Sequence, residues 1–330
     1  MDTNENLFDT SVRVKELKAG DTVLQFFELK AKEVRRTRSG QDYLDLMVGD
    51  ATGAIAGKMW ADAIRKWGTD FEPGDIVKIE GRVEAYRDKN QIVVEKIRRS
   101  DISEVPDSSS VIRCSPLDPE KVMAELIQIA ATLKPPQLSD LVTEVLTENR
   151  EALMTCPAAR MIHHAYRGGL VEHMLTVTRK VEAILALESK INRSLALAGA
   201  MLHDIGKIRE LNAAGKIRTA EGRLLGHVVL GTDIIRSAAA RKGIREEPWM
   251  CELEHILLSH HGEPEFGAPV RPLTREAILV HFIDNLDSKL KIIEEALESA
   301  DSDGFSAYNR WLAGKAYSGS DPVEQEDRYD

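Results

Sequence analysis

Apolar and polar residues alternate along residues 23–97, which is the pattern of half-buried β-strands. Turn signals, the clearest at residues 38–41 and 87–90, divide this region into short strands. A short helical pattern at residues 61–67 falls between the third and the fourth strand. Five strands with one helix in that place predict an all-β OB barrel, to which we assign residues 19–102.

After residue 119 the apolar positions follow the period of amphipathic helices. We expect helices at residues 120–133, 138–149, 170–187, 195–203, 224–240, 249–259 and 275–298. The chain is therefore predicted to be multidomain, with an all-α helical bundle at residues 120–317 after the barrel. Residues 103–119, with three prolines and three consecutive serines, are predicted to be a linker. A polar lead-in (1–18) and an acidic tail (318–330) complete the division.

Composition limits the class of protein. The chain has 330 residues, 43% of them hydrophobic, which is enough for two domains with their own cores. A net charge of −10 argues against a polybasic nucleic-acid binder, although charge can segregate between domains. Three widely spaced cysteines predict a reducing cytoplasm and no disulfide framework. We see no signal peptide and no apolar run of membrane-spanning length, so no membrane partner is expected.

His203 and Asp204 end an apolar helical run just before Gly206. An imidazole and a carboxylate at a protected helix end suit a divalent metal, and a carboxylate can bridge two ions through its two oxygens. Lys207 adds a positive charge one turn later, which suits binding of a phosphate. Asp204 and Lys207 are therefore the candidate catalytic residues.

The nine histidines all lie between residues 163 and 281, and several fall at predicted helix ends. The candidate metal ligands are His173, His203, Asp204, His227, His260, His261 and Asp284. Taken singly, each has a structural explanation as a core histidine, a helix cap, a solvated helix end or a surface ion pair. Together, so many imidazoles and carboxylates facing one core are costly to bury without a cation.

We expect two divalent ions that share Asp204. One ion would bind the side chains of His173, His203 and Asp284. The other would bind His227 and either His260 or His261. Two ions bridged by one carboxylate suit in-line hydrolysis of a phosphoester, because they lower the pKa of a shared water and bind the non-bridging oxygens. Histidine-rich ligation leaves Mn, Fe, Co, Ni, Zn and Mg open.

The spaced pattern of His173, His203, Asp204 and Asp284 is similar to the H…HD…D signature of the HD-domain metal phosphohydrolases. The additional histidines resemble the members of that superfamily that bind two metals. The motif HHAYRGGL at residues 163–170, together with the preceding OB domain, resembles the YhaM-type 3′–5′ exoribonucleases. This second resemblance covers nearly the whole chain.

The resemblance implies a manganese-type metal requirement and removal of nucleotides from the 3′ end of single-stranded RNA. We expect nucleoside 5′-monophosphates as products, with DNA left open as a second substrate. Two other functions stay open: a nucleotide or cyclic-dinucleotide phosphohydrolase, and a nucleic-acid-binding protein with an inactive HD domain. The sequence also leaves homo-oligomerisation open.

Candidate substrate-binding residues fall in two places. His163, His164, Tyr166 and Arg167 precede two glycines, and such a loop can approach a phosphate closely. The structural alternative is a helix–helix turn with Tyr166 in the core. In the barrel the candidates are Arg35, Arg38, Tyr43, Lys58, Trp60 and Arg87, which combine cations with aromatic rings. There the alternatives are protein contacts or oligomerisation, and a buried Trp60.

Overall fold

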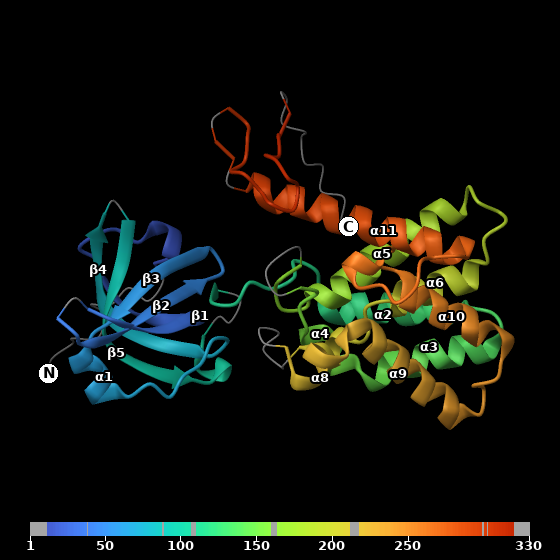
Figure 1. Cartoon of the computed structure of the whole chain (residues 1–330), viewed down its shortest axis with the longest axis horizontal. Coiled ribbons are helices and arrows are strands. Elements are labelled where there is room, and N and C mark those ends of the chain that lie inside the picture. Colours follow the sequence, from blue (N-terminus) through green and yellow to red (C-terminus); the bar gives the residue numbers. More distant parts are fainter. Residues whose placement is uncertain are drawn as a thin grey trace, which may run out of the picture. The chain divides into compact units, whose positions relative to one another are not determined.

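The computed structural model describes residues 12–37, 39–87, 89–106, 110–159, 164–211, 218–298, 300–301 and 303–319. Arg38 and His163, two of the predicted substrate-binding residues, lie outside this part of the chain. The chain divides into two compact units, with the boundary between Cys114 and Ser115 (Figure 1). None of the described helices combines the length and the apolar character needed to cross a bilayer.

The first unit is a closed five-stranded barrel with the strand order β1-β2-β3-β5-β4. Its strands are β1 (Thr22–Arg36), β2 (Asp42–Asp50), β3 (Gly53–Met59), β4 (Ile76–Tyr86) and β5 (Lys89–Ser100). Helix α1 (Ala61–Trp67) lies between β3 and β4, and the short helices η1 (Val14–Glu16) and η2 (Ile102–Glu104) flank the strands. The predicted OB barrel is thus confirmed.

The long strand β1 closes the barrel because it has two partners. Its residues 22–28 pair with β4 and its residues 28–36 with β2, and a bulge between Leu29 and Ala31 interrupts the β1–β2 ladder. A second bulge in the β4–β5 ladder falls at Gly81, where an added Cβ would lie 2.3 Å from the Val93 carbonyl oxygen. Only glycine therefore fits this approach of two backbones. The barrel interior is filled by side chains such as Phe27, Leu29, Leu46, Ile79 and Ile92.

Part of the predicted linker packs on the barrel. Val105 and Val111 are buried in a small apolar cluster with Ile76 of β4 and the partly buried Phe26. These contacts place Val105 and Val111 of the predicted linker in the first unit, which the density of proline and serine did not indicate.

The second unit is all helical, as predicted. Its helices are α2 (Pro119–Ala130), α3 (Pro136–Glu148), α4 (Arg150–Thr155), α5 (Gly169–Leu185), α6 (Arg193–Leu202), α7 (Lys207–Glu210), α8 (Ala220–Leu224), α9 (Gly226–Lys242), α10 (Pro248–Ser259), η4 (Pro264–Phe266) and α11 (Arg275–Leu297). Short α4, α7 and α8 were not predicted. The helix predicted at residues 224–240 is found as α9, which begins two residues later at Gly226, with φ of +73°.

Helix α6 lies in the core of this unit, and every side chain from Leu195 to Leu202 is buried. The Asn192 side chain caps its first turn by accepting from the Ser194 and Leu195 amides. Because no polar residue interrupts the run, the helix is buried on all sides rather than along one stripe. Its C-terminal end therefore brings the next two residues of the chain into the interior.

Candidate metal centre

Five histidines and two aspartates converge on the end of α6 from separate helices. They come from α5 (His173), the turn after α6 (His203 and Asp204), α9 (His227), the end of α10 (His260 and His261) and α11 (Asp284). His203 and Asp204 are almost completely buried, since α6 places them under the surrounding helices. The structure thus brings together all of the predicted metal ligands.

The two oxygens of Asp204 face different sets of imidazoles. Oδ2 lies 3.4 Å from His203 Nε2 and 3.5 Å from His173 Nε2. Oδ1 lies 3.4 Å from His227 Nε2 and 3.8 Å from His260 Nε2. We call His173 and His203 the first histidine group. We call His227, His260 and His261 the second histidine group. Asp204 lies between the groups in the position of a bridging carboxylate.

Asp284 completes the first histidine group. Its Oδ1 lies 3.1 Å from His173 Nε2 and 3.8 Å from His203 Nε2, and the two ring nitrogens are 3.2 Å apart. Two imidazole nitrogens and two carboxylate oxygens, from helices α5 and α11 and from the turn after α6, therefore face one small volume. This is a donor set for a divalent ion such as Mn, Fe, Co, Ni or Zn.

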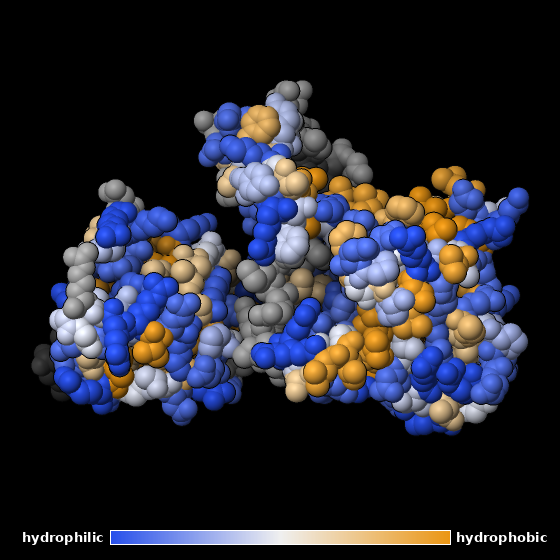
Figure 2. Space-filling view, viewed as in Figure 1, coloured by the Kyte–Doolittle hydropathy of each residue, from blue (hydrophilic) through white to orange (hydrophobic). Residues whose placement is uncertain are grey.

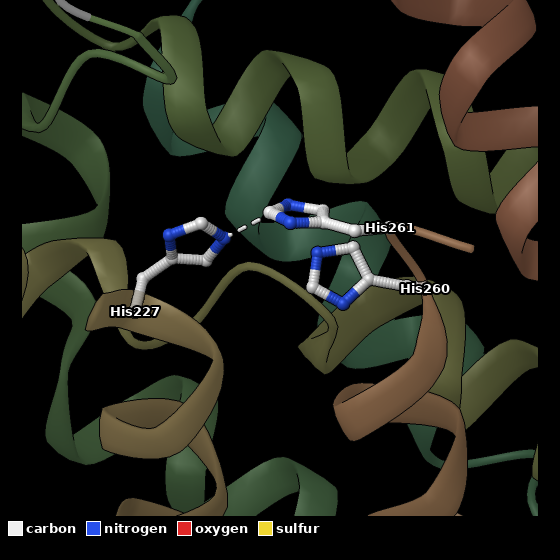
Figure 3. A group of neighbouring side chains, drawn as sticks. All are labelled: His227, His260 and His261. Carbon is white, nitrogen blue, oxygen red and sulfur yellow. Dashed lines mark hydrogen bonds between the residues drawn. The ribbon is translucent and has the colours of Figure 1, made fainter. Parts of the chain in front are cut away.

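The second histidine group consists of three rings turned toward one another (Figure 3). The Nε2 atoms of His227 and His261 are 3.2 Å apart. One ligand atom from each of the three residues lies within 4.8 Å of the others. His260 and His261 are thus both in reach of one ion, so the geometry does not select one of the two.

Three of the five rings have their tautomer fixed by backbone carbonyls, which can only accept a hydrogen bond. Nδ1–H donates to a carbonyl oxygen in His203 (Ala200, 2.9 Å), His260 (Leu257, 2.7 Å) and His261 (Phe266, 2.8 Å). In the neutral form of each ring the proton is therefore on Nδ1, which leaves the lone pair on Nε2, the atom that faces Asp204 or its neighbours. Metal-binding histidines are commonly held in this way.

The other two rings are held by buried carboxylates. His173 Nδ1 is 2.7 Å from Asp287 Oδ2, and His227 Nδ1 is 2.9 Å from Glu210 Oε2. Lys180 Nζ in turn donates to Asp287 Oδ1 at 2.6 Å. Asp287 is itself buried, against the ring of His173. Glu210 was not singled out in the sequence, because nothing in the spacing relates it to His227.

Two buried atoms of the site lack a hydrogen-bond partner among the described residues: Asp204 Oδ1 and His260 Nε2. Both are acceptors in these protonation states, so they cannot hydrogen-bond to each other. Leaving a buried acceptor unpaired costs about 1–3 kcal/mol. A cation would satisfy a carboxylate oxygen and an imidazole lone pair at once, and the residues present therefore fit a divalent metal.

His173 differs in protonation from His260 and His261. Burial lowers the pKa of His173, but Asp284 and Asp287 outweigh burial and raise it to about 10. Burial also lowers the pKa of His260 well below its usual value, and that of His261 to about 4. At neutral pH the metal-free protein therefore holds His173 as imidazolium, whereas His260 and His261 are neutral and ready to coordinate.

Lys207 balances the charge of Asp204. Its Nζ lies 2.5 Å from Asp204 Oδ2. Burial raises the pKa of Asp204, but Lys207 and His203 outweigh burial and hold it well below the usual range. Burial lowers the pKa of Lys207, but Asp204 raises it overall. The pair is therefore ionised at neutral pH, with a fixed positive charge beside the predicted bridging carboxylate.

Two glycines allow the ligand-bearing turns to pack. A Cβ on Gly206 would lie 2.0 Å from the His227 carbonyl oxygen, so glycine permits α9 to approach the turn after α6. Gly262, with φ of +81°, would place a Cβ 2.3 Å from the His281 ring. His281 Nδ1 donates to the His260 carbonyl oxygen at 2.7 Å, so this ring supports the backbone of a ligand.

The loop with the predicted phosphate-binding motif folds back into the core. His164 and Tyr166 are buried, whereas Arg167 is exposed. The Tyr166 hydroxyl donates to Glu172 at 2.9 Å and lies 2.9 Å from His164 Nδ1. His164 Nε2 is 3.4 Å from Asp287 Oδ2, next to His173. His164 and Tyr166 therefore form part of the packing behind the first histidine group. Their side chains are not accessible to an RNA strand. The glycines that follow serve this packing, since a Cβ on Gly169 would lie 2.1 Å from the His164 carbonyl oxygen.

Four of the predicted barrel residues lie together, three of them on neighbouring strands and the fourth, Trp60, between β3 and α1. Arg35 and Lys58 both contact Asp45, at 3.0 and 2.5 Å, and Lys58 Nζ lies 5.5 Å from the centre of the Tyr43 ring. The Tyr43 and Trp60 rings are 5.1 Å apart, and Trp60 is 43% exposed, so it is not a core residue. Arg87 lies apart from them, at the β4–β5 turn over the Tyr86 ring.

We predict that Gly206→Ala displaces His227 and lowers the amount of bound metal. The added Cβ meets the backbone of α9, which cannot move without moving the second histidine group. Metal content per folded protein is the measurement, with the thermal unfolding midpoint recorded alongside. Gly53→Ala is the matched control, because its Cβ has ordinary contacts only, and it should keep full metal content.

We also predict that metal binding to the first histidine group releases a proton near neutral pH. The metal must displace the proton held by His173, so affinity should increase with pH until about pH 10. Calorimetry in buffers of different ionisation enthalpy counts the released protons. Asp287→Asn removes the partner of His173, so fewer protons should be released and affinity should fall about 10–100-fold. Asp233→Asn, at a surface ion pair, should change neither quantity.

Comparisons with known proteins agree with this geometry. The family model described as HD domain matches residues 170–289, and that described as OB-fold nucleic acid binding domain matches residues 31–99. The first match spans the candidate ligands of both histidine groups, and the second falls on the barrel.

Three relatives match most of the chain, and each bears the name 3′–5′ exoribonuclease YhaM. The protein of Halalkalibacterium halodurans is 31% identical over 288 residues, which cover 87% of this chain and 89% of the relative. That of Bacillus subtilis is 32% identical over 84% of this chain and 88% of the relative. That of Oceanobacillus iheyensis is 33% identical over 83% of this chain and 86% of the relative. The chain therefore belongs to the YhaM family of 3′–5′ exoribonucleases.

Proposed function

We propose that this protein is a metal-dependent 3′–5′ exoribonuclease that hydrolyses single-stranded RNA to nucleoside 5′-monophosphates. The observation that carries the proposal is the position of Asp204, whose two oxygens face two separate histidine groups. The relatives that match most of this chain, including its OB and HD domains, bear the name of this activity, which supports RNA as the substrate. DNA is a second substrate to be tested.

We assign one divalent ion to each histidine group, with Asp204 shared between them. The first ion would be held by His173, His203 and Asp284, and the second by the three histidines of the other group. Bound divalent ions act as Lewis acids toward phosphoryl oxygens and lower the pKa of water. We propose manganese as the native metal, because carboxylate and imidazole ligation permits it and the family resemblance implies it.

The side chains around the ligands would orient the scissile phosphate and hold the ligands still. We assign to Lys207 the binding of a non-bridging phosphate oxygen, since its charge lies beside Asp204. Asp287 and Glu210 hold the rings of His173 and His227 through their Nδ1 atoms. A phosphate placed between the two groups would thus meet positive charge from both metals and from Lys207.

We assign strand binding to the barrel surface that carries Arg35, Tyr43, Lys58 and Trp60. Exposed rings next to cations bind single strands without sequence preference, through base stacking and contacts to the phosphates. Asp45 contacts both cations in the protein alone and keeps them on this surface. Arg87 at the β4–β5 turn and the exposed Arg167 of the second unit are further candidates for phosphate contacts.

The assay that tests the proposal uses RNA labelled at its 5′ end and Mn²⁺. We expect progressive shortening from the 3′ end, with nucleoside 5′-monophosphates identified as products by mass spectrometry. Asp204→Asn should reduce the rate at least a thousandfold, because it removes the charge that the two ions share. Asp233→Asn serves as the control and should retain full activity.

Two outcomes of this assay would contradict the proposal. Hydrolysis of mononucleotides or cyclic dinucleotides with no shortening of RNA would indicate a nucleotide phosphohydrolase. Intact RNA in the presence of stoichiometric bound metal would indicate a nucleic-acid-binding protein with an inactive HD domain.

Strand binding is tested by a pair of tryptophans with similar exposure, Trp60 at 43% and Trp67 at 39%. We expect Trp60→Ala to weaken binding of long RNA by about 1–3 kcal/mol, as loss of one stacking platform does. The change should appear in KM for long strands, with kcat on a dinucleotide unaffected. Trp67→Ala, on α1, should leave both constants unchanged; equal effects of the two substitutions would contradict the assignment.

A further inference from the structure

Helix α11 has two faces of opposite character. The inner face carries Asp284 and Asp287, which belong to the metal centre. The outer face carries apolar side chains that remain exposed: Ile278 (45%), Phe282 (63%), Leu286 (46%) and Leu290 (43%). In Figure 2, apolar residues are visible along the part of the helical unit where Figure 1 places α11. The metal centre makes no use of this outer face.

The four side chains form one continuous row, because each follows the previous one by four residues. We call these four residues the apolar row. Rows of this spacing form the ridges by which helices pack against one another. A contiguous apolar row on a long surface helix is typical of a protein–protein contact.

The positions of the four apolar residues are symmetric about the middle of the row, so the row is nearly the same when it is followed in either direction along the helix. Its centre falls at position 284, so in an antiparallel pair Ile278 lies opposite Leu290 and Phe282 lies opposite Leu286. A surface that matches its own reverse meets the requirement of a two-fold interface, in which one patch serves both subunits. The row is therefore complementary to a second copy of itself.

The charges at the two ends of the helix favour the antiparallel arrangement. The spacing of four continues beyond Leu290 to Glu294, which is exposed, while the exposed Arg275 begins α11 at the other end. In an antiparallel pair Glu294 of one copy comes close to Arg275 and the positive N-terminal end of the partner helix. A parallel pair would instead place Glu294 against Glu294.

We propose that two copies of this protein associate through the apolar row, with their α11 helices antiparallel about a two-fold axis near position 284. Each metal centre then lies directly behind the interface, on the inner face of the same helix. The inference concerns self-association and is independent of the proposed nuclease activity.

Sedimentation velocity of the full-length protein tests the proposal. We expect the wild-type protein to sediment at twice the mass, or an even multiple of the mass, of the single chain. Phe282→Glu and Leu286→Glu should each halve the mass, because each buries an unpaired glutamate against an apolar side chain of the partner, and two-fold symmetry repeats this contact. Leu187→Glu changes a leucine that is 80% exposed elsewhere and should leave the mass unchanged. Circular dichroism and metal content, expected to be unchanged in all variants, show that α11 still folds.

The direction of the helices is tested by charge reversal. Arg275→Glu or Glu294→Arg alone should weaken the dimer roughly tenfold, since two-fold symmetry repeats each contact. The double variant should restore wild-type affinity. A wild-type protein that is monomeric at every concentration, or folded Phe282→Glu and Leu286→Glu variants of wild-type mass, would overturn the proposal. Failure of the double variant to recover affinity would overturn the antiparallel arrangement.

Discussion

The charge of Asp204, buried under several helices, is the constraint on which the rest of the second unit depends. A carboxylate taken out of water must be compensated at close range, or it becomes neutral instead. Lys207 compensates one oxygen, while the other faces His227 and His260 without a hydrogen-bond partner among the described residues. The protein alone is thus incompletely balanced at Asp204 Oδ1, and this imbalance favours binding of a cation there. The surrounding helices must then be rigid enough to keep the imidazoles from turning away.

That rigidity comes from the backbone as much as from the side chains. Helix α6 is apolar on every side, so its end cannot move toward solvent without exposing core residues. Backbone carbonyls fix the rings of His203, His260 and His261, and buried carboxylates fix those of His173 and His227. Gly206 and Gly262 remove the Cβ atoms that would hold the ligand-bearing turns apart. The ligands are therefore in place before any ion binds, which reduces the entropic cost of binding.

The sequence predicted the architecture and the convergence of the ligands, because both depend on patterns of local origin. Alternation with turn signals indicated the barrel, and helical period with histidines near helix ends indicated the metal centre. The features that could not be predicted from the sequence depend on tertiary contacts. Glu210 reaches His227 only because α7 and α9 pack at Gly206. Tyr166 is buried because its hydroxyl finds Glu172, and Val105 packs on the barrel despite the prolines around it. No pattern of spacing along the chain indicates any of these three contacts.

Helix α11 connects these arguments, since one helix satisfies two different constraints on opposite faces. Its inner face places Asp284 among the candidate metal ligands and Asp287 against the ring of His173, so the position of the helix must be held closely. A surface helix that packs on one side only is held less firmly than one that packs on both. An exposed apolar face costs little free energy in the folding of a single chain. If a second copy covers this face, however, it adds packing contacts on the side of α11 opposite Asp284 and Asp287. Association through that face would therefore stiffen the first histidine group without adding any residue to it.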